Sequence, residues 1–107
     1  MCFAWFILSF HHDIVDIEFD EKKDQANREE RGFGLAEFKK IDWSSTLTTI
    51  DNRHDYGETR CITIGMIGQR LHVAVWCYRG EKQRIISLRK ANTKEQDEYD
   101  QKIQNHE

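Results

Sequence analysis

The alternation of apolar and polar residues predicts a strand and then a helix near the start of the chain. Residues 14–19 alternate between apolar and mostly polar side chains, and this period of two is typical of a strand. Asp20 then provides a helix N-cap, so a helix is expected to run to about Arg31 and to end at Gly32. The next expected elements are a shorter helix over 35–41 and a strand over 43–52.

The second half of the chain predicts three strands in close succession. Polar turn residues fill 51–57, which is expected to be a loop. The strands are expected over 59–66, 70–79 and 83–89. Turns at 67–69 and at Gly80–Glu81 separate them, and such short connections that contain glycine predict an antiparallel meander. The middle strand is apolar on both faces, which is typical of a central strand covered on two sides.

A last helix is expected from Thr93 to about Gln104, because Thr93 and Gln96 have the spacing of a capping box. Its apolar face is thin and consists of Tyr99 and Ile103. The order of the elements is β-α-α-β-β-β-β-α. This order predicts an α+β fold with a mainly antiparallel sheet, two N-terminal helices and a C-terminal helix.

The length of 107 residues predicts one domain over 1–107. Residues 1–17 are expected to form an N-terminal extension and the first strand, and 100–107 a flexible tail. Residues 1–10 are mostly apolar, but they lack the basic segment and cleavage site of a signal peptide and are too few to span a bilayer. We interpret them as an extra strand, a covering segment or the product of a start codon placed too far upstream, and we expect no membrane partner.

Composition and motifs exclude several classes of protein. Charged residues make up 33% of the chain and 12 residues are aromatic, which indicates a soluble globular protein. Cys2, Cys61 and Cys77 form no CxxC pair, so neither a zinc site nor a disulfide framework is expected, and a reducing cytoplasm is the natural location. Cys61 and Cys77 lie in apolar runs and are expected to pack in the core. Glycine-rich phosphate-binding motifs and the G-x-S-x-G nucleophile motif are missing, and we expect no metal and no cofactor.

The net charge of −3 hides a strong asymmetry along the chain. Residues 1–58 contain 7 Lys/Arg and 13 Asp/Glu, a charge of −6. Residues 60–94 contain 8 and 1, a charge of +7, and residues 95–107 contain 1 and 5, a charge of −4. A basic block therefore coincides with the three strands of the meander, and basic patches are typical of surfaces that bind phosphates.

The hairpin turns set a register that brings several charged residues together. Centring the first turn at Gly68–Gln69 places Arg60 opposite Cys77 and Glu58 opposite Arg79. The second turn brings Arg84 beside Tyr78, and the loop that contains His54 leads into the same end of the sheet. Arg89 falls near Val73, about 13 Å further along the strand.

This group of residue types suits phosphate chemistry. Guanidinium groups bind phosphate and stabilise the charge of a pentacoordinate transition state, while Glu58 or His54 could act as a general base on a ribose 2′-hydroxyl. The alternative interpretation is structural, since Glu58 and Arg79 could form an ordinary cross-strand ion pair. On spacing alone, Lys23 and Asn27 of the first helix are ordinary surface residues.

The ordered set of these residues resembles the BrnT toxins of bacterial toxin–antitoxin pairs over about residues 18–99. The resemblance rests on Phe19-Asp20, Lys23, Asn27 and Gly32, then on His54-Asp55-Tyr56-Gly57-Glu58-x-Arg60, Gly65, Arg79-Gly80, the stretch Arg84-Ile85-Ile86-Ser87-Leu88-Arg89-Lys90-Ala91, Glu95 and Tyr99. Single pieces are common, but the full set in this order is specific.

The resemblance implies a RelE-like fold and a metal-independent endoribonuclease that cleaves RNA and inhibits translation. It also implies neutralisation by a BrnA-like antitoxin with a ribbon-helix-helix part, through which the complex binds operator DNA and represses its own operon. Carried over by position, the catalytic residues are expected to be Lys23, His54, Glu58, Arg60, Arg79 and Arg89. The residues expected to bind the substrate are Asn27, Arg84, Ser87 and Lys90.

Two residues depart from the family pattern. Phe19 stands where the family usually has Trp, which is a packing substitution. Arg31 stands where the family usually has His, and an arginine cannot shuttle a proton because it stays charged. This substitution motivates an alternative function, a weak or inactive toxin that binds its antitoxin and acts as a co-repressor of its operon. A structural or adaptor protein is a third hypothesis.

Overall fold

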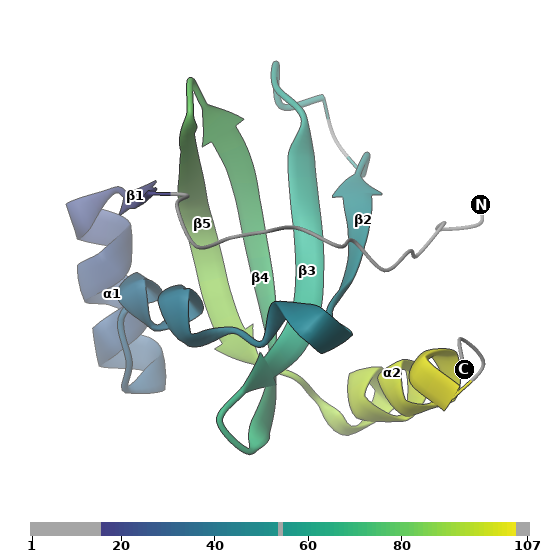
Figure 1. Cartoon of the computed structure of the whole chain (residues 1–107). Coiled ribbons are helices and arrows are strands. Elements are labelled where there is room, and N and C mark those ends of the chain that lie inside the picture. Colours follow the sequence, from purple (N-terminus) through teal and green to yellow (C-terminus); the bar gives the residue numbers. More distant parts are fainter. Residues whose placement is uncertain (1–15, 54, 105–107) are drawn as a thin grey trace.

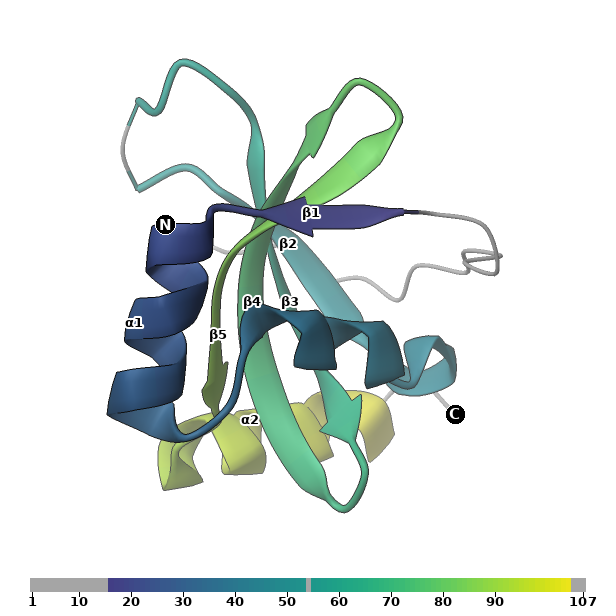
Figure 2. The same ribbon diagram turned by 90° about the vertical axis from the view of Figure 1, so that its left-hand side faces the viewer.

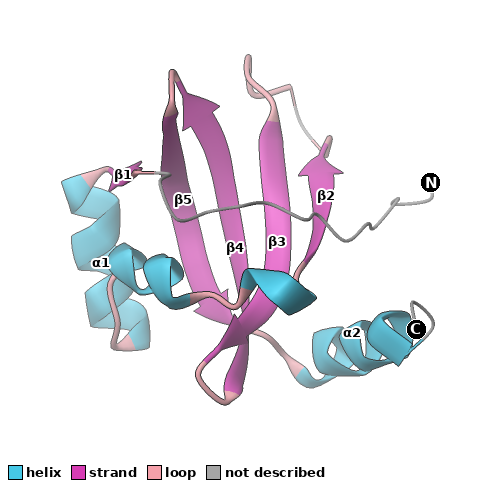
Figure 3. Ribbon diagram, in the orientation of Figure 1, coloured by secondary structure: helices cyan, strands magenta, loops and turns pink. Residues whose placement is uncertain are grey.

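The computed structural model describes residues 16–53 and 55–104. Two α-helices, two short 3₁₀ helices and five strands follow one another along this part of the chain (Figures 1 and 3). In chain order they are β1 (Ile17–Phe19), α1 (Glu21–Arg31), η1 (Leu35–Lys40), η2 (Trp43–Ser45), β2 (Leu47–Asp51), β3 (Arg60–Ile67), β4 (Arg70–Arg79), β5 (Lys82–Lys90) and α2 (Thr93–Gln104). The α+β class expected from the sequence is therefore confirmed.

The five strands form one sheet in the order β1-β5-β4-β3-β2. The strands β2 to β5 pair antiparallel, whereas β1 pairs parallel with β5. The meander β3–β4–β5 is confirmed. β4 has the expected bounds, and those of β3 and β5 differ by about one residue from the prediction. Glycine at φ 63° and 62° makes the two tight turns, at Gly68 and Gly80.

Local capping defines α1 as the sequence predicts. The Asp20 carboxylate accepts a hydrogen bond from the backbone N–H of Lys23 at 3.0 Å, which satisfies one N–H of the first turn. Gly32 ends the helix in the left-handed region, at φ 85°, and its N–H donates to the carbonyl of Arg28.

Three predicted elements differ from the structure. The first strand covers only Ile17–Phe19, since Asp16 is not in a strand and residues 14 and 15 lie outside the described residues. The second helix is a 3₁₀ helix. The strand expected over 43–52 is wrong at its start, because Asp42 accepts hydrogen bonds from Ser44 and caps the short helix η2, so that β2 begins at Leu47.

The capping box of α2 lies one residue earlier than predicted. The Asn92 side chain accepts from the N–H of Glu95 at 2.8 Å, and the Glu95 carboxylate accepts from the N–H of Asn92 at 2.9 Å. The pair Thr93 and Gln96 is therefore the wrong one. Residues 100–104, expected in a flexible tail, belong to α2, and Ile103 packs against the core.

Two hydrophobic layers cover the two sides of the sheet, as the apolar pattern of β4 predicts. On one side, which we call the η1 face, Trp76 and Ala74 pack against Leu35 and Phe38 of η1. On the other side, the α2 face, Leu47, Ile64, Leu71 and Val73 pack with Tyr99 of α2. Figures 1 and 2 show α1 at the β1–β5 edge and η1 across one face of the sheet. Cys77 is buried in the sheet and Cys61 packs against the η1-face layer, in agreement with their expected core positions.

Candidate functional site

The α2 face carries most of the predicted polar residues in rows that follow the strand register. One row joins Arg60 of β3, Cys77 of β4 and Arg84 of β5, and the pair Arg79–Lys82 lies further out. The next rows are Ile62–Val75–Ser87 and Ile64–Val73–Arg89. Neighbouring rows are two residues apart, or about 6.7 Å along the strands.

The bulge between Val75 and Trp76 explains why Arg84 and Ser87 share this face. A strand alternates its side chains, so two positions three apart would normally face opposite sides. The extra residue in β5 restores the alternation. The register expected from the sequence placed Arg84 beside Tyr78, which is wrong, because Arg84 pairs with Cys77 and Gln83 pairs with Tyr78. The positions of Arg60 and Arg89 agree with the expected register.

Glu58 joins two arginines at the outer end of the face. Its carboxylate accepts from Nε of Arg60 at 3.3 Å and from Nη2 of Arg79 at 3.1 Å. The hydrogen bond from Arg60, with the charges of both arginines, holds the pKa of Glu58 below its usual range. The carboxylate is therefore ionised at neutral pH and is a proton acceptor rather than a donor. We call Glu58, Arg60 and Arg79 the Glu58 cluster.

The loop before β3 is held by a buried carboxylate at the end of β2. Asp51 has a side chain that is 1% exposed and accepts from Nε and Nη2 of Arg53 at 2.7 and 2.8 Å and from the Tyr56 hydroxyl at 3.1 Å. The hydrogen bonds from Arg53 lower the pKa of Asp51 to about 2. The Tyr56 ring in turn lies 4.0 Å from the Arg60 guanidinium, a cation–π contact. Hydrogen bonds and a cation–π contact therefore connect Asp51 through Tyr56 to the Glu58 cluster.

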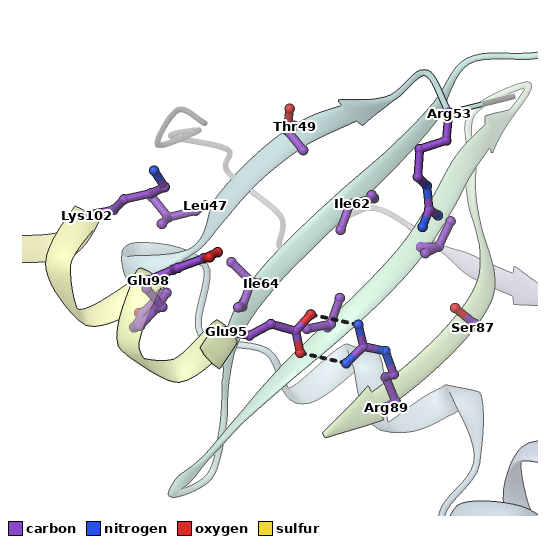
Figure 4. Close-up of a pocket in the computed structure, with 13 residues that line it drawn as sticks. Leu47, Thr49, Arg53, Ile62, Ile64, Ser87, Arg89, Glu95, Glu98 and Lys102 are labelled. Atoms are coloured by element: carbon purple, nitrogen blue, oxygen red, sulfur yellow. Dashed lines mark hydrogen bonds and ion pairs between the residues drawn. The ribbon is translucent and has the colours of Figure 1, made fainter. Parts of the chain in front are cut away.

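Arg89 is fixed by α2 at the other end of the face. Its Nη1 and Nη2 both donate to the Glu95 carboxylate at 2.7 Å, a bidentate pair of the kind that guanidinium also forms with phosphate (Figure 4). The carboxylate of Glu95 raises the pKa of Arg89. Because Glu95 also completes the capping box with Asn92, the first turn of α2 positions Arg89.

A cavity of about 470 Å³ separates these two ends. Figure 4 shows it between α2 and the sheet, with the Arg53 side chain extending over its upper end and the Arg89–Glu95 pair at its lower side. Its floor is aliphatic, and its lining residues are Leu47, Thr49, Arg53, Ile62, Ile64, Val73, Val75, Ser87, Arg89, Glu95, Glu98, Tyr99 and Lys102. We call it the α2 pocket. Arg53 was not predicted as a site residue, and the only signal for it in the sequence is the Asp51-x-Arg53 spacing in a polar loop.

The remaining predicted site residues lie in several places. Arg84 is on the α2 face, 3.6 Å from Glu18, and Ser87 lines the α2 pocket. Lys23 is exposed on α1, and Lys90 pairs with His72 on the η1 face. Asn27 is buried, where its amide donates to the Phe33 carbonyl and accepts from Arg31. His54 lies outside the described residues.

The described residues contain neither a candidate metal site nor a candidate membrane-spanning helix. Within residues 16–53 and 55–104, no three His, Cys, Asp or Glu side chains are grouped so that they could hold a metal ion. Among the same residues no helix has the length and apolar character needed to cross a membrane.

A model of a known protein family matches most of the chain. The family model described as "Ribonuclease toxin, BrnT, of type II toxin-antitoxin system" matches residues 19–95, from the end of β1 to the first turn of α2. No curated protein sequence matches the chain.

Proposed function

Because the chain belongs to the BrnT family of ribonuclease toxins of type II toxin–antitoxin systems, we propose that it is an endoribonuclease that cleaves RNA without a metal ion and thereby inhibits translation. The observation that supports this function is the Glu58 cluster, in which one carboxylate lies between two guanidinium groups at the open end of the sheet. A base beside two phosphate-binding cations is the minimum that this reaction needs.

The reaction assigned to the cluster is an attack of the ribose 2′-hydroxyl on the adjacent phosphate. The 2′-oxygen forms a bond to phosphorus while the bond from phosphorus to the 5′-oxygen breaks. The products are a 2′,3′-cyclic phosphate and a 5′-hydroxyl end. Glu58 accepts the proton of the 2′-hydroxyl, and Arg60 and Arg79 bind the phosphate and stabilise the charge of its pentacoordinate state. Lys23 and His54 stay the candidates that supply a proton to the leaving oxygen.

The remaining assignments follow from the family. We propose a RelE-like fold, a cytoplasmic location and a BrnA-like antitoxin with a ribbon-helix-helix part. The complex of toxin and antitoxin would bind operator DNA through the antitoxin.

Arg31, the departure that motivates the co-repressor alternative, has a local role in packing. Its Nη1 donates to the Asn27 side chain at 2.7 Å and to the Leu88 carbonyl at 3.4 Å. These bonds connect the end of α1 to β5, and neither partner belongs to the Glu58 cluster. Arg31 therefore has a structural role in this chain, as a contact between α1 and β5.

Cleavage of RNA by protein freed of antitoxin, in buffer with EDTA, tests the proposal. Glu58→Gln should lower the cleavage rate by about 10²-fold or more, which is the typical contribution of a general base. Glu30→Gln removes an exposed carboxylate from α1 and should leave the rate unchanged. Expression in cells should arrest growth, and Arg60→Ala should abolish the arrest.

Two results would contradict the proposal. Intact RNA after incubation with the purified protein, together with normal growth on expression, would remove the ribonuclease function and leave the co-repressor alternative. Cleavage that stops on addition of EDTA and returns with a divalent cation would refute the metal-independent reaction.

A further inference from the structure

We propose that the α2 pocket binds one nucleotide of a single-stranded RNA beside the scissile bond, with the base on its aliphatic floor and a phosphate at Arg53. This inference rests on the proposed function, since it places a substrate next to the Glu58 cluster. It assigns the pocket a ligand class and gives Arg53 a role in binding.

The floor of the pocket is an apolar surface that the fold does not cover. α2 buries the inner row of the α2 face, where Ile64 and Val73 are 6% exposed. In the next row Ile62 and Val75 are only partly buried, although they lie on β3 and β4, two interior strands of the sheet. A concave apolar surface with a few polar groups is typical of a ligand site, and nucleobases bind between apolar side chains as well as aromatic ones.

Arg53 is a preorganised guanidinium group at the edge of this floor. Its Nε and Nη2 are fixed by Asp51, whose carboxylate is buried, so the side chain loses little further freedom when it binds. Tyr56 binds the same carboxylate, and the Arg53 side chain is still 57% exposed. A planar guanidinium with one edge on a buried carboxylate therefore presents its other edge to an anion.

A second guanidinium group in the pocket supports an anionic ligand. Arg53 and Arg89 both line the pocket, so a phosphate inside it can be contacted from two sides of the lining. Each of the two arginines is held by a carboxylate, Asp51 and Glu95 respectively. The pocket therefore offers a phosphate two guanidinium groups that are already held in place.

The position of the pocket indicates RNA in single-stranded form. Asp51, which holds Arg53, pairs with Arg60 of the Glu58 cluster, and the floor residues Ile62 and Val75 form the adjacent row. A chain bound at the cluster can therefore continue over Arg53 in the direction of α2. Its base can reach the floor only when it is unstacked, because bases in a duplex are paired inside the helix.

Binding of a probe that cannot be cleaved tests this inference. The probe is a short 2′-O-methyl oligonucleotide, which lacks the attacking hydroxyl, and binding is followed by methyl NMR of the full chain. The signals of Ile62 and Val75 should shift, and that of Ile50, which is 51% exposed on the η1 face, should not. Arg53→Ala should weaken binding about tenfold, the loss of one charge-assisted contact. Arg28→Ala is the matched control. It removes an exposed arginine of α1 that also pairs with a carboxylate, and it should not change the affinity.

Three results would overturn the inference. The first is binding of inorganic phosphate at Arg53 as tightly as the oligonucleotide with no shift at Ile62. The second is equal affinity for a duplex of the same sequence. The third is unchanged affinity in both Arg53→Ala and the pocket-filling variant Val75→Phe, which would show that the oligonucleotide does not bind in the pocket.

The two proposals fail in different ways. If the wild-type chain cleaves no RNA but the oligonucleotide shifts the floor methyl groups, the ribonuclease function fails and the subsite remains. If RNA is cleaved and Arg53→Ala changes neither KM nor the affinity for the probe, the subsite fails and the ribonuclease function remains.

Discussion

Substitution of Asp51 by asparagine should remove a large part of the dependence of stability on acid pH. The carboxylate is buried, with a folded pKa of about 2 against an ordinary value of 3.8. The unfolded chain therefore takes up a proton at a higher pH than the folded chain. Stability contributed by this group is complete well above pH 3.8 and is lost as the pH falls towards the folded pKa.

The size of the effect follows from the shift. A difference of 3.8 − 2 pKa units corresponds to about 2.4 kcal/mol at 1.36 kcal/mol per unit. About 1 kcal/mol of this is lost by pH 3, and about 2 kcal/mol by pH 2. Asparagine cannot ionise, so the difference in the free energy of unfolding between the wild-type chain and Asp51→Asn should shrink by these amounts.

Urea unfolding at pH 7, 4 and 3 measures this difference directly. Other carboxyl groups with lowered pKa, such as Asp24 and Glu95, are present in both chains and cancel. Asp97→Asn removes an exposed carboxylate from α2 and is the matched control. A difference between wild type and Asp51→Asn that stays constant from pH 7 to pH 3 would refute the assignment of Asp51 as the ionised anchor of the loop.

Three further substitutions test the packing that supports the site, each by urea unfolding at pH 7. Gly65→Ala should cost about 1–3 kcal/mol, because its Cβ would lie 2.7 Å from Cγ2 of the buried Thr46; a neutral result would mean that this contact relaxes freely. Trp76→Phe should cost about 1–3 kcal/mol, since it leaves the Thr63 hydroxyl without the indole N–H that donates to it at 2.8 Å. Asn92→Ala should cost about 1 kcal/mol through the lost cap of α2, and no loss would argue against the observed capping box.

Features encoded by neighbouring residues are the ones that the sequence predicts well. The bounds of α1 follow from Asp20 and Gly32, and the meander follows from two turns that each need a glycine with positive φ. The central place of β4 follows from its apolar residues on both faces, because both layers of the core contact that strand. Each of these signals lies within a few residues of the structure that it specifies.

A contact between two secondary-structure elements decides which of two capping boxes begins α2. Asn92/Glu95 and Thr93/Gln96 both have the spacing of a capping box, one residue apart. In the structure Glu95 also forms the bidentate pair with Arg89, which lies on a strand rather than in the helix. That pair, between residues of β5 and α2 that are six positions apart, favours the earlier box, and no pattern within the helix contains this information.

The same reason explains which site residues escaped prediction. The turn-rich sequence around Arg53 gives no sign that its neighbour Asp51 is buried at the end of a strand. Conversely, Asn27 looks like an exposed helical residue, but its amide is used to join α1 to Phe33. Burial of a polar group is a property of the assembled fold, and it determines whether the group is held in place or left open to a ligand.

The basic and acidic segments, which are separate along the sequence, pair with one another in the folded chain. Four arginines of the basic block on the α2 face have acidic partners, and every partner comes from the acidic segments that flank the block. The pairs are Arg60 and Arg79 with Glu58, Arg84 with Glu18, and Arg89 with Glu95. The block is therefore not a bare cationic surface.

These pairs set a condition on any RNA that binds there. A single phosphate only exchanges one charge-assisted pair for another, so it gains little from an arginine that already has a carboxylate partner. A single RNA strand gains more binding free energy when it places several phosphates along the rows and also a base on the uncovered apolar surface. The internal ion pairs cannot replace the contribution of the base. The acidic segments thus lower the affinity for polyanions in general more than the affinity for a strand that fits the face. The specificity comes from competition between carboxylates and phosphates, and not from additional contacts.

Replacing Glu18 and Glu95 by glutamine should accordingly raise non-specific binding to a duplex more than binding to a single strand. The reverse order would show that the pairs do not compete with phosphate.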